Sequence, residues 1–139
     1  MFLAYNTIIK GYNHRKSIMK KKTVLVTEDD KDIAQFISTA LEEAGYKVVC
    51  VYDGVKAIEI LQEQEVNLII LDIMMPVFSG YWFCDVFKKN PLTKDIPVIF
   101  ISALNGEDDI KRGMELGASA YLTKPFKIQR LVDAVNSLV

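Results

Sequence analysis

The sequence predicts an α/β fold, a doubly wound parallel sheet of five strands flanked by five helices. After residue 22, five short apolar runs alternate with five segments that have helical periodicity. This alternation is typical of βα units that build a parallel sheet. Right-handed crossovers and short connections leave few other topologies for it. A length of 139 residues fits a single domain of this kind.

The five predicted strands are short and evenly spaced along the chain. The first carries three aliphatic residues between two threonines, as expected for a strand that is buried on both faces of a parallel sheet. The strands are predicted at 23–27, 47–52, 67–72, 97–101 and 119–123.

Apolar residues at three- and four-residue spacing predict the helices between these strands. Gly45 and Gly117 close two of them, as glycine does at helix C-termini. Gly113 lies inside the fourth helix, at a cost of about 1 kcal/mol against alanine, so this helix is expected to be only lightly stabilised. The helices are predicted at 30–44, from 53 onward, at 81–89, 107–116 and 126–138.

The first 22 residues differ in charge from the rest of the chain. They contain six of the 17 basic residues and no acid, so residues 23–139 carry 11 basic and all 18 acidic residues. No signal-peptide pattern is present, and Met19 precedes Lys20 as an alternative start. We therefore expect a basic N-terminal extension at 1–22 that the fold does not need, and one domain at 23–139.

Cysteine and apolar patterns narrow the class of protein further. Cys50 and Cys84 are the only cysteines and form no CxxC pair, so neither a redox motif nor a zinc site is predicted, and both are expected to be buried free thiols. Every apolar stretch is shorter than the ~18 residues that span a membrane. A cytoplasmic protein without membrane contact is the expectation.

Polar residues follow four of the five predicted strands at the point where each strand ends. Glu28 and Asp29 follow the first strand, Asp72 ends the third, Ser102 follows the fourth and Lys124 follows the fifth. Open α/β sheets bind ligands at this edge. Three carboxylates, a hydroxyl and an ammonium group suit a divalent cation held together with a phosphoryl group.

In order and spacing, these residues resemble the receiver domain of two-component response regulators, over residues 23–139. Asp72 lies 30 residues before Ser102 and 52 before Lys124, as in that family. The shared motifs are Glu28-Asp29, Leu-Asp-Ile-Met-Met-Pro around Asp72, Gly80, Ser102-Ala103 and Tyr121–Phe126. The resemblance implies a chemotaxis-type, single-domain receiver with a flavodoxin-like sheet of order 2-1-3-4-5.

Asp72 is the predicted phosphoacceptor because a carboxylate can attack a phosphoryl group and carry it as an acyl phosphate. Mg²⁺, or Mn²⁺ in its place, prefers oxygen ligands, and Asp29 and Asp72 can supply them directly. The resemblance adds the backbone carbonyl of Met74 as a ligand, and Glu28 as a ligand through water.

The remaining roles concern the phosphoryl group itself. Lys124 supplies a cation for its oxygens, and Ser102 can donate a hydrogen bond to it. The resemblance adds a backbone contact from Ala103, a cis bond before Pro125, and an aromatic switch residue, Tyr121, that works with Ser102. The surface of the fourth helix, fifth strand and fifth helix is then the expected output face.

The predicted partners are proteins. His14 is the only histidine and lies in the basic extension, so the phosphoryl group is expected from a histidine kinase or a phosphotransfer protein. The downstream protein partner is unknown, no direct DNA binding is expected, and the chain is expected to be a monomer or a phosphorylation-linked dimer. It is expected to act as a signalling domain and not as an enzyme.

Other functions remain open at this point. A phosphohydrolase would need a second carboxylate where Met74 stands, and a flavodoxin-like cofactor binder would need a Gly/Ser/Thr-rich loop after the first strand. The chain could also be the receiver part of a longer regulator with an output domain, or a phosphorylation-independent scaffold. The segment Tyr81-Trp82-Phe83 is interpreted as core packing, with an exposed docking patch at Trp82 as the alternative.

Overall fold

The computed structural model describes residues 20–139, and its centre is one sheet of five parallel strands. The strand order is β2-β1-β3-β4-β5, so the predicted fold class is confirmed. The first 19 residues, which hold most of the predicted extension, lie outside the described residues. The strands are β1 (Thr23–Thr27), β2 (Lys47–Val51), β3 (Leu68–Asp72), β4 (Val98–Ser102) and β5 (Ala120–Thr123).

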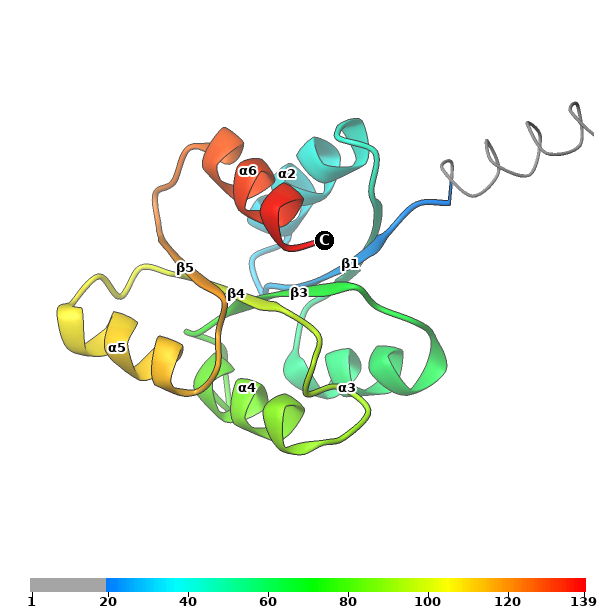
Figure 1. The fold of residues 1–139 in the computed structure, drawn as a ribbon. Helices are drawn as coiled ribbons and strands as arrows, with labels where there is room; N and C mark the ends of the chain where they lie inside the picture. Colours follow the sequence, from blue (N-terminus) through cyan, green and yellow to red (C-terminus); the bar gives the residue numbers. More distant parts are fainter. Residues whose placement is uncertain (1–19) are drawn as a thin grey trace, which may run out of the picture.

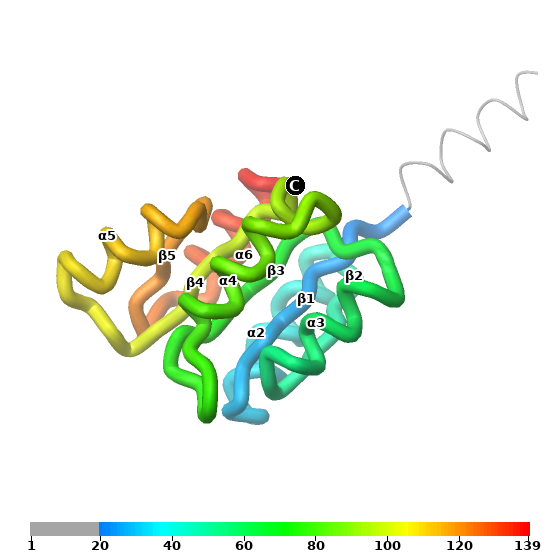
Figure 2. Tube along the Cα trace, turned by 90° about the horizontal axis from the view of Figure 1, so that it is seen from below, coloured from blue at the N-terminus to red at the C-terminus, as the bar shows by residue number. Residues whose placement is uncertain are grey.

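Five helices cover the two faces of the sheet in two layers (Figure 1). Helices α2 and α6 lie on one face, and α3, α4 and α5 lie on the other. Figure 2 shows the second layer from below, with α3, α4 and α5 side by side across the sheet. The helices are α2 (Lys31–Glu43), α3 (Gly54–Glu63), α4 (Gly80–Lys89), α5 (Glu107–Glu115) and α6 (Ile128–Leu138).

Capping positions explain where the helices start relative to their predicted starts. Asp30 and Asp53 lie one residue before α2 and α3, where their carboxylates accept hydrogen bonds from backbone amides of the first turn. Helix α4 begins at Gly80, one residue before its predicted start, because Ser79 caps that helix. The last helix begins at Ile128 and not at residue 126, since Lys127 has extended backbone angles.

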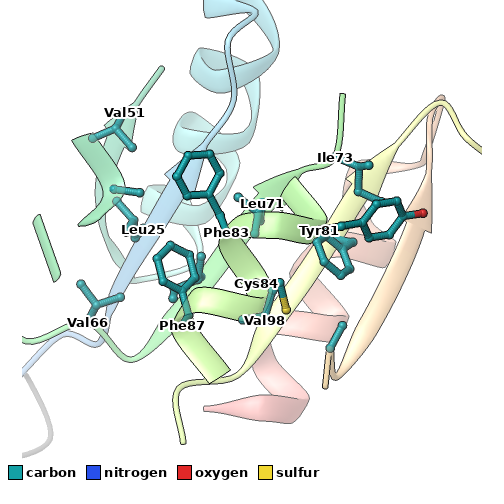
Figure 3. Packing of buried hydrophobic residues seen from close by; sticks show 14 residues of the cluster. Leu25, Val51, Val66, Leu71, Ile73, Tyr81, Phe83, Cys84, Phe87 and Val98 are labelled. Carbon is teal, nitrogen blue, oxygen red and sulfur yellow. The ribbon is translucent and has the colours of Figure 1, made fainter. Parts of the chain in front are cut away.

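The core between the sheet and the α3–α5 layer is rich in aromatic side chains (Figure 3). Tyr81, Phe83 and Phe87 of α4 are at most 4% exposed and point toward β1, β3 and β4. The predicted core role therefore holds for Tyr81 and Phe83. It is wrong for Trp82, which is 46% exposed and stacks on Phe78 with ring centroids 4.6 Å apart.

Two further expectations can be compared with the described residues. Cys84 is fully buried and unpaired, and burial raises the pKa of its thiol to about 11, whereas Cys50 is free but only partly buried. No helix among residues 20–139 is long and apolar enough to cross a membrane.

Candidate functional site

The register of the sheet brings the predicted site residues to one edge. Thr27 pairs with Leu71, so Glu28 and Asp72 follow side by side at the ends of β1 and β3. On the other side of β3, Asp72 pairs with Ile101 of β4, directly before Ser102. The amide of Lys124 donates to the Ser102 carbonyl at 2.7 Å, which brings the end of β5 to the same edge.

Three carboxylates form the centre of this edge. Glu28, Asp29 and Asp72 each offer an oxygen within 4.8 Å of the others. Glu28 is fully buried and Asp72 is 3% exposed, whereas Asp29 is exposed. The Oε2 atom of Glu28 has no hydrogen-bond partner among the described residues. An all-oxygen set with an unpartnered buried carboxylate oxygen fits a hard divalent cation such as Mg²⁺ or Mn²⁺.

Lys124 is the cation of the cluster. Its Nζ atom lies 2.5 Å from Oε1 of Glu28 and 3.4 Å from Oδ2 of Asp72. Burial alone would lower the pKa of Lys124, but the hydrogen bond to Glu28 and the charges of both carboxylates outweigh it and raise that pKa. Lys124 is therefore a permanent positive charge beside Asp72. The peptide bond between Lys124 and Pro125 is cis, as the resemblance implies.

The charge state of Glu28 is set by its surroundings. Burial, and then the contact with the neighbouring Asp72 carboxylate, raise the pKa of Glu28 to about 8, although Lys124 opposes the shift. Close carboxylates repel one another, and a bound cation would relieve that repulsion. This electrostatic strain is a second reason why the residues present fit a metal.

The hydroxyl groups of Ser102 and Tyr121 are linked through one residue. Ser102 is fully buried, and its Oγ accepts a hydrogen bond from the amide of Leu104 at 3.1 Å. The Tyr121 hydroxyl donates to the carbonyl of the same Leu104 at 2.6 Å. Burial raises the pKa of Tyr121 to about 12, so its hydroxyl stays protonated. Ala103 lies between these groups and is exposed.

The loop after β3 orients Asp72. The amide of Met74 donates to Oδ1 of Asp72 at 3.2 Å. Gly80 closes the loop, because its amide donates to the carbonyl of Ile73 at 2.8 Å. A Cβ atom at Gly80 would lie only 2.2 Å from the backbone oxygen of Asp72. The role expected for the Met74 carbonyl stays a prediction.

Two residues near the site were missed by the sequence reasoning. The hydroxyl of buried Tyr81 donates to the carbonyl of Asp109 at 2.8 Å, which ties α4 to the first turn of α5. The guanidinium of Arg112 lies 4.3 Å from the centre of the Tyr81 ring. The sequence marks Tyr81 only as a core residue and does not mark Arg112, because the two residues meet only when two helices that are distant in sequence pack together.

The geometry matches a known class of signalling domain. The family model of the response regulator receiver domain matches residues 24–136, and the chain belongs to this family. Such domains are the receiving components of two-component systems; they are signalling domains and not classical enzymes, and they bind Mg²⁺ or Mn²⁺ at an acidic pocket.

Individual relatives agree with this assignment. The chain is 39% identical over 121 residues to a protein of Cyanophora paradoxa named as a probable transcriptional regulator, ycf27, which covers 87% of the chain and 49% of the relative. The chain thus spans about half the length of this curated relative.

Two solved structures show the same fold. A putative response regulator from Chloroflexus aurantiacus has a TM-score of 0.82 and 32% identity, over 86% of the chain and 98% of its own. The response regulator Rcp1, solved in a Mn²⁺-bound form, has a TM-score of 0.70 and 30% identity, over 84% of the chain and 90% of its own.

Proposed function

We propose that residues 23–139 act as a phosphoacceptor domain in which Asp72 receives a phosphoryl group from a histidine kinase or a phosphotransfer protein. The observation that carries the proposal is the position of Asp72. Its carboxylate is nearly buried at the end of the central strand, between the Lys124 ammonium group and two further carboxylates. Such a setting serves charge neutralisation and positioning, which phosphoryl transfer needs more than acid–base chemistry.

In the proposed step, a carboxylate oxygen of Asp72 attacks the phosphorus atom of the donor. A new P–O bond forms while the bond from phosphorus to the donor nitrogen or oxygen breaks, and the bonding electron pair leaves with the donor. The Met74 amide holds the Asp72 carboxylate in a fixed orientation. Lys124, only 3.4 Å from that carboxylate, faces the charge that the arriving oxygens bring.

Metal binding is proposed for the three carboxylates. Asp29 and Asp72 would be direct ligands, Glu28 would contribute through water, and the Met74 carbonyl would complete the protein set. The support is the all-oxygen cluster, the unpartnered Oε2 of Glu28 and the Mn²⁺-bound form of the relative Rcp1. When bound, the cation supplies positive charge that offsets the phosphoryl oxygens.

Signalling is proposed to begin at Ser102. Its hydroxyl, together with the backbone at Ala103, would contact the phosphoryl group, and the bond from the Leu104 amide would then have to change. The carbonyl of Leu104 also accepts a hydrogen bond from the Tyr121 hydroxyl, so a shift of the Leu104 backbone would release Tyr121. The surface formed by α5, β5 and α6 is the proposed output face for a downstream protein partner, as a monomer or as a phosphorylation-linked dimer.

The proposal is tested by intact-protein mass after incubation with Mg²⁺ and acetyl phosphate. We expect one added phosphoryl group in the wild type, none in Asp72→Asn, and none when EDTA removes the metal. Asp85→Asn is the matched control, because Asp85 is a partly exposed carboxylate paired with Lys89 on α4, and it should leave the adduct unchanged. An adduct that persists in folded Asp72→Asn would contradict the assignment.

A second candidate function follows from the length of the curated relative. The chain spans about half of a protein named as a transcriptional regulator, so residues 23–139 could serve as the receiver part of a longer regulator. The output face would then act on a domain of the same polypeptide. The reading frame of the gene beyond Val139 decides between the two: an open frame of domain length favours the longer regulator.

A further inference from the structure

An open depression of about 570 Å³ lies beside the acidic cluster. Among residues 20–139, two charged residues line it: Asp29, which follows β1, and Arg112 of α5. Met74 and Leu104, two residues after Asp72 and Ser102 respectively, line it as well. The depression therefore reaches from Asp29, one carboxylate of the acidic cluster, to a cation on α5.

Arg112 is supported by a fixed aromatic ring. Its guanidinium lies 4.3 Å from the centre of the Tyr81 ring, within the range of a cation–π contact. The ring itself is held, because Tyr81 is 4% exposed, packs edge-on against Phe100 and donates its hydroxyl to the Asp109 carbonyl. Arg112 is thus positioned at the depression although its side chain is exposed.

No carboxylate among residues 20–139 forms a salt bridge with Arg112. Two of the four acidic residues on α5 are engaged elsewhere: the Asp109 carboxylate accepts from the Gly106 amide, and Glu115 pairs with Lys111. Lys124 differs, since it already contacts two carboxylates. The guanidinium of Arg112 therefore keeps its donors for an external anion.

We propose that Arg112 is a specificity-determining residue that attracts dianionic phosphodonors into this depression. The exposed Asp29 carboxylate lines the same depression and would repel such donors, and the guanidinium of Arg112 offsets that repulsion. A cation at the entrance raises the local concentration and the encounter rate of an anion. The planar guanidinium group also suits phosphate oxygens. This inference rests on the proposed function of Asp72.

The test compares Arg112→Gln with Lys111→Gln, an exposed lysine on the same helix that serves as the matched control. Initial phosphorylation rates are measured by intact mass at low donor concentration and saturating Mg²⁺. With the dianion acetyl phosphate, we expect Arg112→Gln to lose about three- to ten-fold in rate and Lys111→Gln to be unchanged. With the monoanion phosphoramidate, the loss should be smaller, and 0.5 M salt, about the level at which such charges are screened, should reduce both losses.

Arg112→Lys keeps the charge and should recover most of the acetyl phosphate rate, which separates electrostatics from packing. Unfolding curves and Mg²⁺ titration calorimetry on each variant check the fold and the metal site. An acetyl phosphate rate within two-fold of wild type in Arg112→Gln overturns the inference. So does a loss that is equal for both donors or that accompanies weaker Mg²⁺ binding. If the proposed function itself is wrong, the result is different: the wild type then gains no phosphoryl group.

Discussion

Replacing Gly80 by alanine is expected to destabilise the protein by about 3 kcal/mol, although alanine favours helices. Gly80 is the first residue of α4, and a Cβ atom there would lie 2.2 Å from the Asp72 oxygen and 2.8 Å from the Ile73 Cα atom. Both are backbone atoms of the segment that carries the proposed phosphoacceptor. They cannot turn away as a side chain could, so the strand end or the helix start has to move.

Urea unfolding of Gly80→Ala measures this loss, and Gly106→Ala is the control. Gly106 also lies at the start of a helix with an ordinary backbone angle, and its Cβ would approach only the flexible Asp109 carboxylate, at 2.9 Å. We expect the control to lose about 1 kcal/mol or less, as an N-cap replacement does. Equal losses in the two variants would show that the close approach to Asp72 is not the cause.

The metal-free protein is expected to lose stability as pH rises from about 5 to about 8, and Glu28→Gln should remove most of that loss. Burial raises the pKa of Glu28 to about 8 in the folded protein, against 4.5 for an unburied carboxyl group. Between these values the folded state binds more protons than the unfolded state, so the free energy of unfolding falls as pH increases. The stabilising contribution is complete below the lower value and is lost through the upper one.

Urea unfolding in EDTA at both ends of this pH range tests the expectation. Glutamine keeps the shape of Glu28 and can still accept a hydrogen bond from Lys124, so at the upper pH Glu28→Gln should exceed the wild type by at least about 1 kcal/mol. Asp29→Asn, an exposed member of the same cluster, should retain the wild-type pH dependence. Identical pH dependence in wild type and Glu28→Gln would refute the assigned cause.

Mg²⁺ should counteract the loss of unfolding free energy that the wild type shows at higher pH. A cation favours the ionised form of the Glu28 carboxyl group, so it competes with the proton at low pH and binds more readily near pH 8. The increase in unfolding free energy caused by Mg²⁺ is therefore expected to grow with pH. Glu28→Gln should lack most of this growth.

The fold and the centre of the candidate site could be predicted because they depend on short-range patterns. Buried strands and capped helices leave their mark on consecutive residues, and a parallel register collects the residues that follow each strand. Glu28, Asp72 and Lys124 meet for that reason alone. The protonation of Glu28 could not be predicted, since it results from the full burial of one carboxyl group beside another.

Contacts between separate helices also could not be predicted from the sequence. The pairing of Tyr81 with Arg112 depends on how α4 and α5 pack, and neither periodicity nor spacing encodes it. The exposure of Trp82 could not be predicted, because the sequence of a short aromatic segment is consistent with either face of the helix. Its neighbours Tyr81 and Phe83 occupy the core and leave Trp82 to stack on Phe78 outside it.

Gly113 has a packing role in the structure. Its missing side chain looked like a weakness of the helix, but a Cβ atom there would lie 3.0 Å from the ring of Phe100 and 3.1 Å from that of Tyr121. Here the α5 backbone rests directly on two rings, and no flexible side chain lies between them to absorb a displacement. A rotation of one tyrosine ring would therefore be transmitted to an entire helix, which makes a change in a single torsion angle visible on the surface of the protein.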